Sequence, residues 1–213
     1  MNDARKLVKI APVDAPVVYI VDDDPSIREA LVDLFLSIRT EAHAFEDARD
    51  LLDKADLKRP GCILLDVRLP GANGLDFQLH LEKIGNRMPI IFMTGHGDIP
   101  MTVRAMKAGA VDFLAKPFRD QDILDAVSVA FQKDREVRQQ SATNDVVAEL
   151  AKTLTRRERE VMAAVVLGLM NKQIAFNLGI SEITVKLHRG NVMRKMEVRS
   201  VAELVRKAEL LGL

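Results

Sequence analysis

Consecutive carboxylates follow an apolar run near the start of the chain, in the sequence VVYIVDDDP (17–25). Helix initiation accounts for Asp24, because Asp is a favoured N-cap and the proline after it suits the first helical position. It leaves Asp22 and Asp23 unexplained. A further carboxylate, Asp66, ends the next long apolar run. Because parallel strands present their carboxyl ends at one edge of a sheet, we expect these three side chains to converge there.

Three carboxylates packed together would repel one another unless a cation lay among them. Oxygen-only ligands at an open site favour Mg²⁺, which binds one or two carboxylates together with phosphate oxygens. Thr94 and Lys116 each follow another strand-like run, so a hydroxyl and an ammonium reach the same edge. This set of side chains predicts phosphoryl transfer to a carboxylate nucleophile.

The elements that must hold these residues alternate strand-length apolar runs with amphipathic stretches. Continuous runs rich in Val and Ile are typical of parallel strands that are buried on both faces. Since parallel strands need right-handed crossovers, the order predicts a five-stranded doubly wound α/β sheet of the flavodoxin-like kind. The expected strands are 17–21, 42–45, 62–65, 90–93 and 111–114, and the expected helices are 26–37, 47–56, 75–84, 102–108 and 120–132.

After residue 154 the strand pattern does not return, and helix start and stop signals follow one another. Thr155 and Glu158 form a capping box, in which each side chain satisfies a free backbone donor of the other. Gly168 and Gly179 are typical of helix ends, and Ser181 is a favoured N-cap. Two short helices joined through a Gly-containing turn predict a helix-turn-helix in a small all-α domain.

Composition places the chain among folded proteins, with 48% apolar and 29% charged residues. The net charge of zero conceals opposite ends: residues 1–132 hold 16 Lys and Arg against 21 Asp and Glu, whereas residues 153–213 hold 11 against 6. A single cysteine, Cys62, excludes an intramolecular disulfide framework. No signal-peptide h-region and no apolar run of membrane-spanning length occur, so we expect a cytoplasmic protein with no membrane partner.

Four motifs in the first part resemble the receiver domain of two-component response regulators, and the whole chain resembles the NarL/FixJ family. They are DDDP (22–25), LLDVRLPGANG (64–74), FMTGHGD (92–98) and DFLAKPF (112–118). The resemblance implies that Asp66 is the phosphoacceptor and that Asp22, Asp23 and Asp66 hold Mg²⁺ with the backbone carbonyl of Arg68. It further implies roles for Thr94 as the switch hydroxyl, Lys116 as the phosphoryl-binding lysine and Phe113 as the switch aromatic.

The second part is similar to LuxR-type helix-turn-helix domains, through LTRREREV (154–161) and GLMNKQIAFNLGISEITVKLHRGNVMRKM (168–196). The similarity implies a positioning helix at 171–178 and a recognition helix at 182–196 that enters the major groove of DNA. We expect Ile180, Val185, Val192 and Met196 to face the core. The outward set is expected to be Thr184, Lys186, Leu187, His188, Gly190, Asn191 and Lys195, with Lys172, Arg189 and Arg194 contacting phosphates.

The resulting hypothesis is a phosphorylation-controlled transcription factor. Its implied partners are a sensor histidine kinase, double-stranded promoter DNA, RNA polymerase and a second copy of the chain after phosphorylation. The switch works either by dimerisation or by release of the helix-turn-helix domain. A haloacid-dehalogenase-like phosphatase is the enzyme alternative, but Arg68 stands where that class needs an acid/base Asp. The expected parts are a tail (1–16), a receiver domain (17–132), a linker (133–152) and the DNA-binding domain (153–213).

Overall fold

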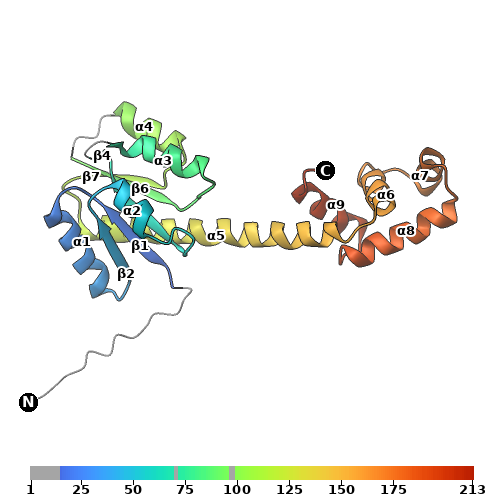
Figure 1. Ribbon diagram of the computed structural model, residues 1–213, viewed down its shortest axis with the longest axis horizontal. Helices are drawn as coiled ribbons and strands as arrows, with labels where there is room; N and C mark the ends of the chain where they lie inside the picture. The colour runs from blue at the N-terminus through green and yellow to red at the C-terminus, as the bar shows by residue number, and fades with distance from the viewer. Residues whose placement is uncertain (1–14, 70–71, 96–98) are drawn as a thin grey trace, which may run out of the picture. The chain divides into compact units, whose positions relative to one another are not determined.

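The computed structural model describes residues 15–69, 72–95 and 99–213. The chain divides into two compact units, Met1–Val137 and Arg138–Leu213, and most of their elements are labelled in Figure 1. The predicted tail lies almost wholly outside the described residues, as do residues 70–71 and 96–98 of two sequence motifs. None of the helices in the described part of the chain is long and apolar enough to cross a membrane.

The first unit contains a parallel five-stranded sheet with strand order β2-β1-β3-β6-β7, as predicted. Each strand of this sheet matches a predicted one to within a residue at either end, and the inner strands β1, β3 and β6 are buried along their whole length. A short antiparallel pair, β4 with β5, follows β3. The strands are β1 (Val17–Val21), β2 (Glu41–Phe45), β3 (Gly61–Asp66), β4 (Arg68–Leu69), β5 (Ala72–Asn73), β6 (Ile90–Thr94) and β7 (Asp112–Ala115).

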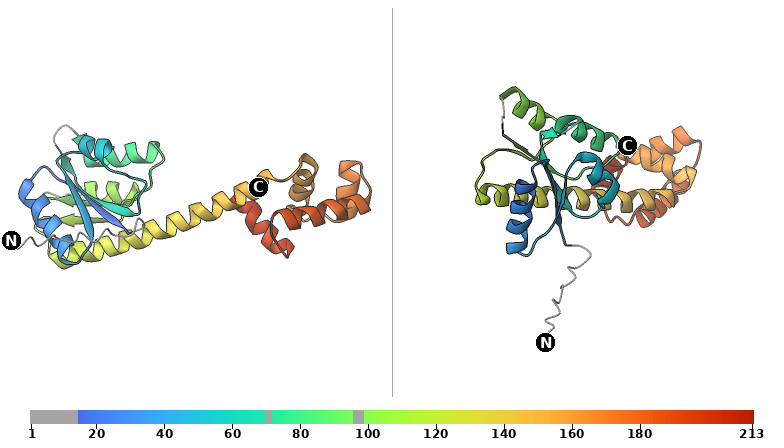
Figure 2. Two further views of the ribbon diagram at one scale, coloured as in Figure 1. Left: turned by 60° about the horizontal axis from the view of Figure 1, so that its bottom comes forward. Right: turned by 60° about the vertical axis from the view of Figure 1, so that its left-hand side comes forward.

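Helices cover both faces of this sheet, and the two layers can be followed in Figure 2. Side chains of β1 alternate between the layers: Val17, Tyr19 and Val21 pack in one core, and Val18 and Ile20 in the other. The first core takes residues from α2, α3 and α4, and the second takes residues from α1 and α5. The helices are α1 (Pro25–Ser37), α2 (Ala48–Lys54), α3 (Gly74–Lys83), α4 (Ile99–Lys107) and α5 (Asp120–Lys152).

The second unit is helical, and its helix α6 begins from the predicted capping box, with Thr155 and Glu158 exchanging hydrogen bonds. Gly179 ends α7 in the left-handed region at φ +64°, and Ser181 caps α8, so three residues make the turn of the helix-turn-helix. Its core contains Val185, Val192 and Met196, as expected from their spacing. The helices are α6 (Arg156–Val166), α7 (Asn171–Leu178), α8 (Glu182–Lys195) and α9 (Val201–Leu210).

Residues 133–152, expected as a linker, lie entirely within α5. Asp134 is buried and accepts a hydrogen bond from the backbone N–H of Gly61 at 3.1 Å, within the first unit. Val147 belongs to the core of the second unit. The predicted linker therefore supplies side chains to each core, and the two units part inside it.

Candidate functional site

The acidic cluster lies at the carboxyl edge of the sheet, where four strands of the predicted set end. Asp22 follows β1, Asp66 ends β3, Thr94 ends β6 and Lys116 follows β7. These strands are consecutive neighbours in the sheet, so their ends meet at one edge. The structure thus brings together residues that are separated by up to 94 positions in the chain.

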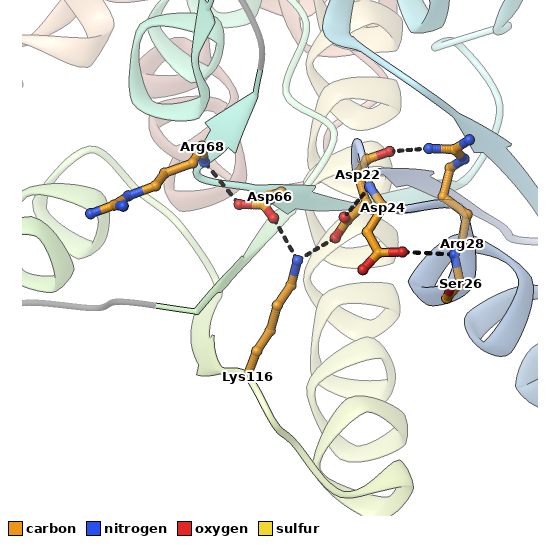
Figure 3. Close-up of polar contacts among 7 residues, drawn as sticks. All are labelled: Asp22, Asp24, Ser26, Arg28, Asp66, Arg68 and Lys116. Carbon is orange, nitrogen blue, oxygen red and sulfur yellow. Dashed lines mark hydrogen bonds and ion pairs between the residues drawn. The ribbon is translucent and has the colours of Figure 1, made fainter.

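Lys116 joins the two buried carboxylates of this edge (Figure 3). Its Nζ lies 2.6 Å from Oδ2 of Asp22 and 2.5 Å from Oδ2 of Asp66. The side chains of Asp22 and Asp66 are 0% and 10% exposed, and that of Lys116 is 15% exposed. The backbone of Lys116 is also fixed, because its N–H donates to the carbonyl of Thr94 at 2.7 Å.

Burial and ion pairing have opposite effects on the pKa values of Asp22 and Lys116. Burial raises the pKa of Asp22, and the hydrogen bond from Lys116 offsets only part of that effect. Burial also opposes the charge on Lys116, but hydrogen bonds to Asp22 and Asp66 outweigh it and raise the pKa of the amine. Lys116 is therefore a permanent cation at neutral pH, and an additional cation would further favour ionised Asp22.

Backbone donors orient the remaining carboxylate oxygens. Oδ1 of Asp66 accepts from the N–H of Arg68 at 2.8 Å, and Oδ1 of Asp22 accepts from the N–H of Asp24 at 3.0 Å. Asp24 also caps α1, as predicted, by accepting from the N–H of the second residue of that helix. Figure 3 shows the Asp66 and Asp22 carboxylates on either side of the Lys116 amine, with the N–H of Arg68 at the far oxygen of Asp66.

Three carboxylates at this edge are close enough together to hold a metal ion. Asp22, Asp23 and Asp66 each offer an oxygen, and these oxygens lie within 4.8 Å of one another. Asp23 is exposed, so the cluster is open to solvent on one side. An all-oxygen, solvent-open donor set fits Mg²⁺, which retains several waters when it binds to proteins.

Thr94 and Phe113, predicted as the switch pair, occupy neighbouring strands. Thr94 is fully buried at the end of β6. Phe113 is half-buried on β7, and its ring centroid lies 6.3 Å from that of Phe92 at an interplanar angle of 44°. Phe113 packs against the core that contains Ala105 of α4.

Two residues that position the site were not singled out from the sequence. Gly74 begins α3, where an added Cβ would lie 2.8 Å from the backbone oxygen of Asp66 and 3.2 Å from Cε1 of Phe92. Arg28 donates from Nη1 to the backbone oxygen of Asp22 at 2.7 Å. The glycine-rich loop after Asp66 was a signal for the first, but only the fold reveals the second.

In the second unit, the predicted DNA-contacting residues differ in exposure. Thr184 shares a hydrogen bond of 2.8 Å with Ser181, and Nη1 of Arg189 donates to Oδ1 of Asn171 at 2.7 Å. Arg189 thus ties α8 to the start of α7. Those exposed are Lys172, Lys186, Leu187 and Arg194, and those half-buried are Thr184, His188, Arg189 and Asn191.

The expectation that Lys195 faces outward is wrong. Its Nζ donates to Oε2 of Glu158 at 2.6 Å and to the backbone oxygen of Thr153 at 3.0 Å. The side chain of Glu158 is 4% exposed and that of Lys195 is 23% exposed. A buried carboxylate at the start of α6 therefore holds this lysine against the domain.

Two family descriptions match the chain. Residues 18–128 match the response regulator receiver domain, and residues 152–208 match the bacterial regulatory proteins of the luxR family. Among similar proteins, Nodulation protein W of Bradyrhizobium diazoefficiens is 53% identical over 197 residues, which are 92% of this chain and 87% of that protein. Transcriptional regulatory protein FixJ of Azorhizobium caulinodans is 45% identical over 208 residues, covering 94% of this chain and 95% of the relative.

Solved structures of response regulators are also similar to this chain over both of its units. The response regulator StyR, in a structure described as low-resolution, aligns with a TM-score of 0.77 and 48% identity over 92% of this chain and 98% of its own. Full-length FixJ from B. japonicum aligns with a TM-score of 0.56 and 38% identity over 92% and 97% of the two chains.

Proposed function

Because this chain belongs to the response regulators, with a receiver domain and a luxR-type DNA-binding domain, we propose that its transcriptional function is controlled by a phosphoryl group on Asp66. The observation that carries this assignment is the ammonium of Lys116 between Asp66 and Asp22 at the carboxyl edge of the sheet. Asp66 is the carboxylate that ends the central strand, and its Oδ1 is already oriented by the N–H of Arg68.

The proposed reaction is an in-line displacement at phosphorus. An oxygen of Asp66 forms the new O–P bond while the bond from phosphorus to the donor, a histidine nitrogen of a sensor kinase, breaks. Lys116 then neutralises charge on the transferred group, and the hydroxyl of Thr94 donates to one of its oxygens. No general base is required, because the carboxylate attacks in its ionised form.

Mg²⁺ is the proposed cofactor, held by Asp22, Asp23, Asp66 and the backbone carbonyl of Arg68. When bound, it would supply positive charge to the phosphoryl oxygens. The side chains of Asp22, Asp23 and Asp66 fit this ion, because they offer only oxygen atoms and these lie within 4.8 Å of one another. Lys116 supplies the remaining compensation for the buried carboxylates.

The proposed output is a change in packing on the β7 side of the receiver domain. When the hydroxyl of Thr94 turns towards the phosphoryl group, Phe113 moves inwards and alters the surface formed by α4, β7 and α5. Phosphorylation would thereby favour one of two packings, which leads either to dimerisation or to release of the DNA-binding domain. Moving this equilibrium from 1:99 to 99:1 needs about 5.5 kcal/mol.

The residues proposed to contact DNA lie on α7 and α8. Their proposed target is promoter DNA in the cytoplasm, where RNA polymerase is a further proposed partner. Base edges would be contacted by Lys186 and by the neighbouring residues of α8, and phosphates by exposed cations. The proposed domain boundaries stay at 17–132 and 153–213, with α5 passing through residues 133–152. The proposed contact set is Lys172, Thr184, Lys186, Leu187, His188, Arg189, Asn191 and Arg194.

Incubation of the chain with acetyl phosphate and Mg²⁺ tests the assignment against the phosphatase alternative. Intact-mass measurement should find one added phosphoryl group that is lost slowly, and Asp66→Asn should abolish it. Asp76→Asn, which changes a carboxylate on α3, is the matched control and should leave it unchanged. Sustained multiple turnover on small phosphoesters would contradict the regulator assignment, and an adduct that survives in Asp66→Asn would contradict the choice of residue.

A further inference from the structure

The outermost side of α8 is apolar at its start. Ile183 is 80% exposed and Leu187 is 64% exposed. At 3.6 residues per turn, Ile183, Leu187 and the exposed Gly190 fall within about 60° of the helix circumference, and we refer to these three residues as the α8 stripe. The buried Val185 and Val192 lie on the opposite side, at 0% and 1% exposure. The label α8 in Figure 1 locates this helix.

Packing within the chain does not account for the α8 stripe. An isoleucine that is 80% exposed stabilises no core, and β-branched residues are weaker helix formers than alanine. Glycine in a helix interior also lowers helix stability relative to alanine. A Cβ at Gly190 would meet no atom within 4 Å among the described residues, so close packing does not require glycine there.

We propose that the α8 stripe faces the floor of the DNA major groove and that Ile183 and Leu187 contact the C5-methyl groups of thymines. The proposal rests on the DNA binding proposed above and names what this helix recognises. The thymine methyl is the apolar group on base edges in the major groove, and residues at the start of a recognition helix reach those edges. Gly190 would allow the helix backbone to come close to the bases.

The charges around the stripe favour DNA over a second copy of the chain. Lys186 adjoins Leu187, Arg194 follows Gly190 by one turn, and both cations are exposed. Residues 153–213 hold 11 Lys and Arg against 6 Asp and Glu. Two copies meeting through this surface would bring like charges together, whereas phosphates on both sides of the groove would pair with them.

The test uses the full chain, phosphorylated with acetyl phosphate, and a duplex that the wild-type chain selects from a randomised DNA pool. Each thymidine of that duplex is replaced in turn by deoxyuridine, which removes the methyl group and leaves the hydrogen-bonding edge. Wild-type affinity should fall about fourfold at a contacted position, as expected for one buried methyl. Ile183→Ala should bind more weakly and show no further loss at one such position.

Leu167→Ala is the matched control, because Leu167 is a 78% exposed apolar residue at the end of α6. It should retain the wild-type response to uracil at every position. Equal uracil sensitivity of wild type and Ile183→Ala, or none in either, would overturn the inference while leaving DNA binding intact. If Ile183→Ala binds both duplexes more weakly by the same factor and also dimerises more weakly in sedimentation, Ile183 contacts a second copy, which would also overturn the inference.

Gly190→Ala gives an independent measurement. Since alanine is the better helix former and meets no neighbour, the thermal midpoint of the helical unit should rise while affinity for the selected duplex falls severalfold. Unchanged affinity would overturn the close approach of α8 to the bases. If the wild-type chain selects no duplex from the randomised DNA pool, the proposed DNA binding itself is refuted.

Discussion

Replacing Lys116 by methionine should destabilise the receiver domain, because it leaves two carboxylates without their shared cation. Lys116 lies within 2.6 Å of Asp22 and Asp66, and Asp22 is fully buried. Methionine retains most of the apolar stem, so the change removes charge more than volume.

The magnitude follows from the burial of these groups. Removing one partner of a buried ion pair costs about 3–5 kcal/mol. The lower end applies here, because the site opens to solvent at Asp23 and water can screen the remaining charges. We therefore expect a loss of about 3 kcal/mol in the free energy of unfolding, or about 1–3 M in the urea midpoint.

The chain offers a selective probe for this measurement. Tyr19 is its one tyrosine, and it has no tryptophan. The ring is 2% exposed on β1, and its hydroxyl donates to the backbone oxygen of Asp56 at 2.9 Å. Tyrosine fluorescence during urea unfolding therefore reports on the receiver domain alone.

A double variant separates lost charge compensation from general damage. Lys116→Met with Asp22→Asn should be more stable than Lys116→Met alone, because the unpaired buried charge is gone. Added Mg²⁺ should stabilise Lys116→Met more than it stabilises the wild-type chain. An unchanged urea midpoint in Lys116→Met, or a double variant less stable than the single one, would refute the reasoning.

Three further predictions concern pairs and groups outside this edge. Hydrogen bonds from Arg59 lower the pKa of Glu41 to about 2. The stabilising effect of its charge is therefore complete above the ordinary value of 4.5 and is lost as pH falls through 2. In urea unfolding, Glu41→Gln should cost about 1 kcal/mol at pH 7 and clearly less at pH 2. Cys62 is fully buried, and burial raises the pKa of its thiol. A thiol reagent should therefore modify the native chain only as fast as the receiver domain opens. Complete modification of Cys62 within the mixing time would contradict this prediction. Lys195→Met should lower the stability of the helical unit by about 2 kcal/mol in thermal unfolding, because it leaves Glu158 buried without its cation. Weaker DNA binding at unchanged stability would instead indicate that Lys195 contacts DNA.

The sheet could be predicted from the sequence because its strands are short apolar runs between clear helices. The run Val17–Val21 is observed with the predicted bounds. The convergence of Asp22, Asp66, Thr94 and Lys116 followed from strand order alone, since parallel strands share a carboxyl edge. The capping box at Thr155 could also be predicted, because both of its partners lie within one helical turn.

Two features that sequence reasoning missed depend on contacts that exist only in the folded chain. Lys195 was placed on the outer face because its partner Glu158 is 37 residues away. Gly74 lies against Asp66 only once the loop has folded back onto the sheet. The linker was expected to continue the preceding helix, with its stiffness left open; the polar stretch 138–145 contains neither proline nor glycine, and it lies within α5.

We expect the phosphoryl state of Asp66 to set the affinity of the chain for DNA. The most direct measurement is a titration of one selected duplex with the phosphorylated chain, the unphosphorylated chain and Asp66→Asn treated with acetyl phosphate. Phosphorylation should tighten binding by a factor within about 5 to 150, the usual range of allosteric coupling, and Asp66→Asn should bind like the unphosphorylated chain. Equal affinity of the phosphorylated and unphosphorylated chains would contradict the claim.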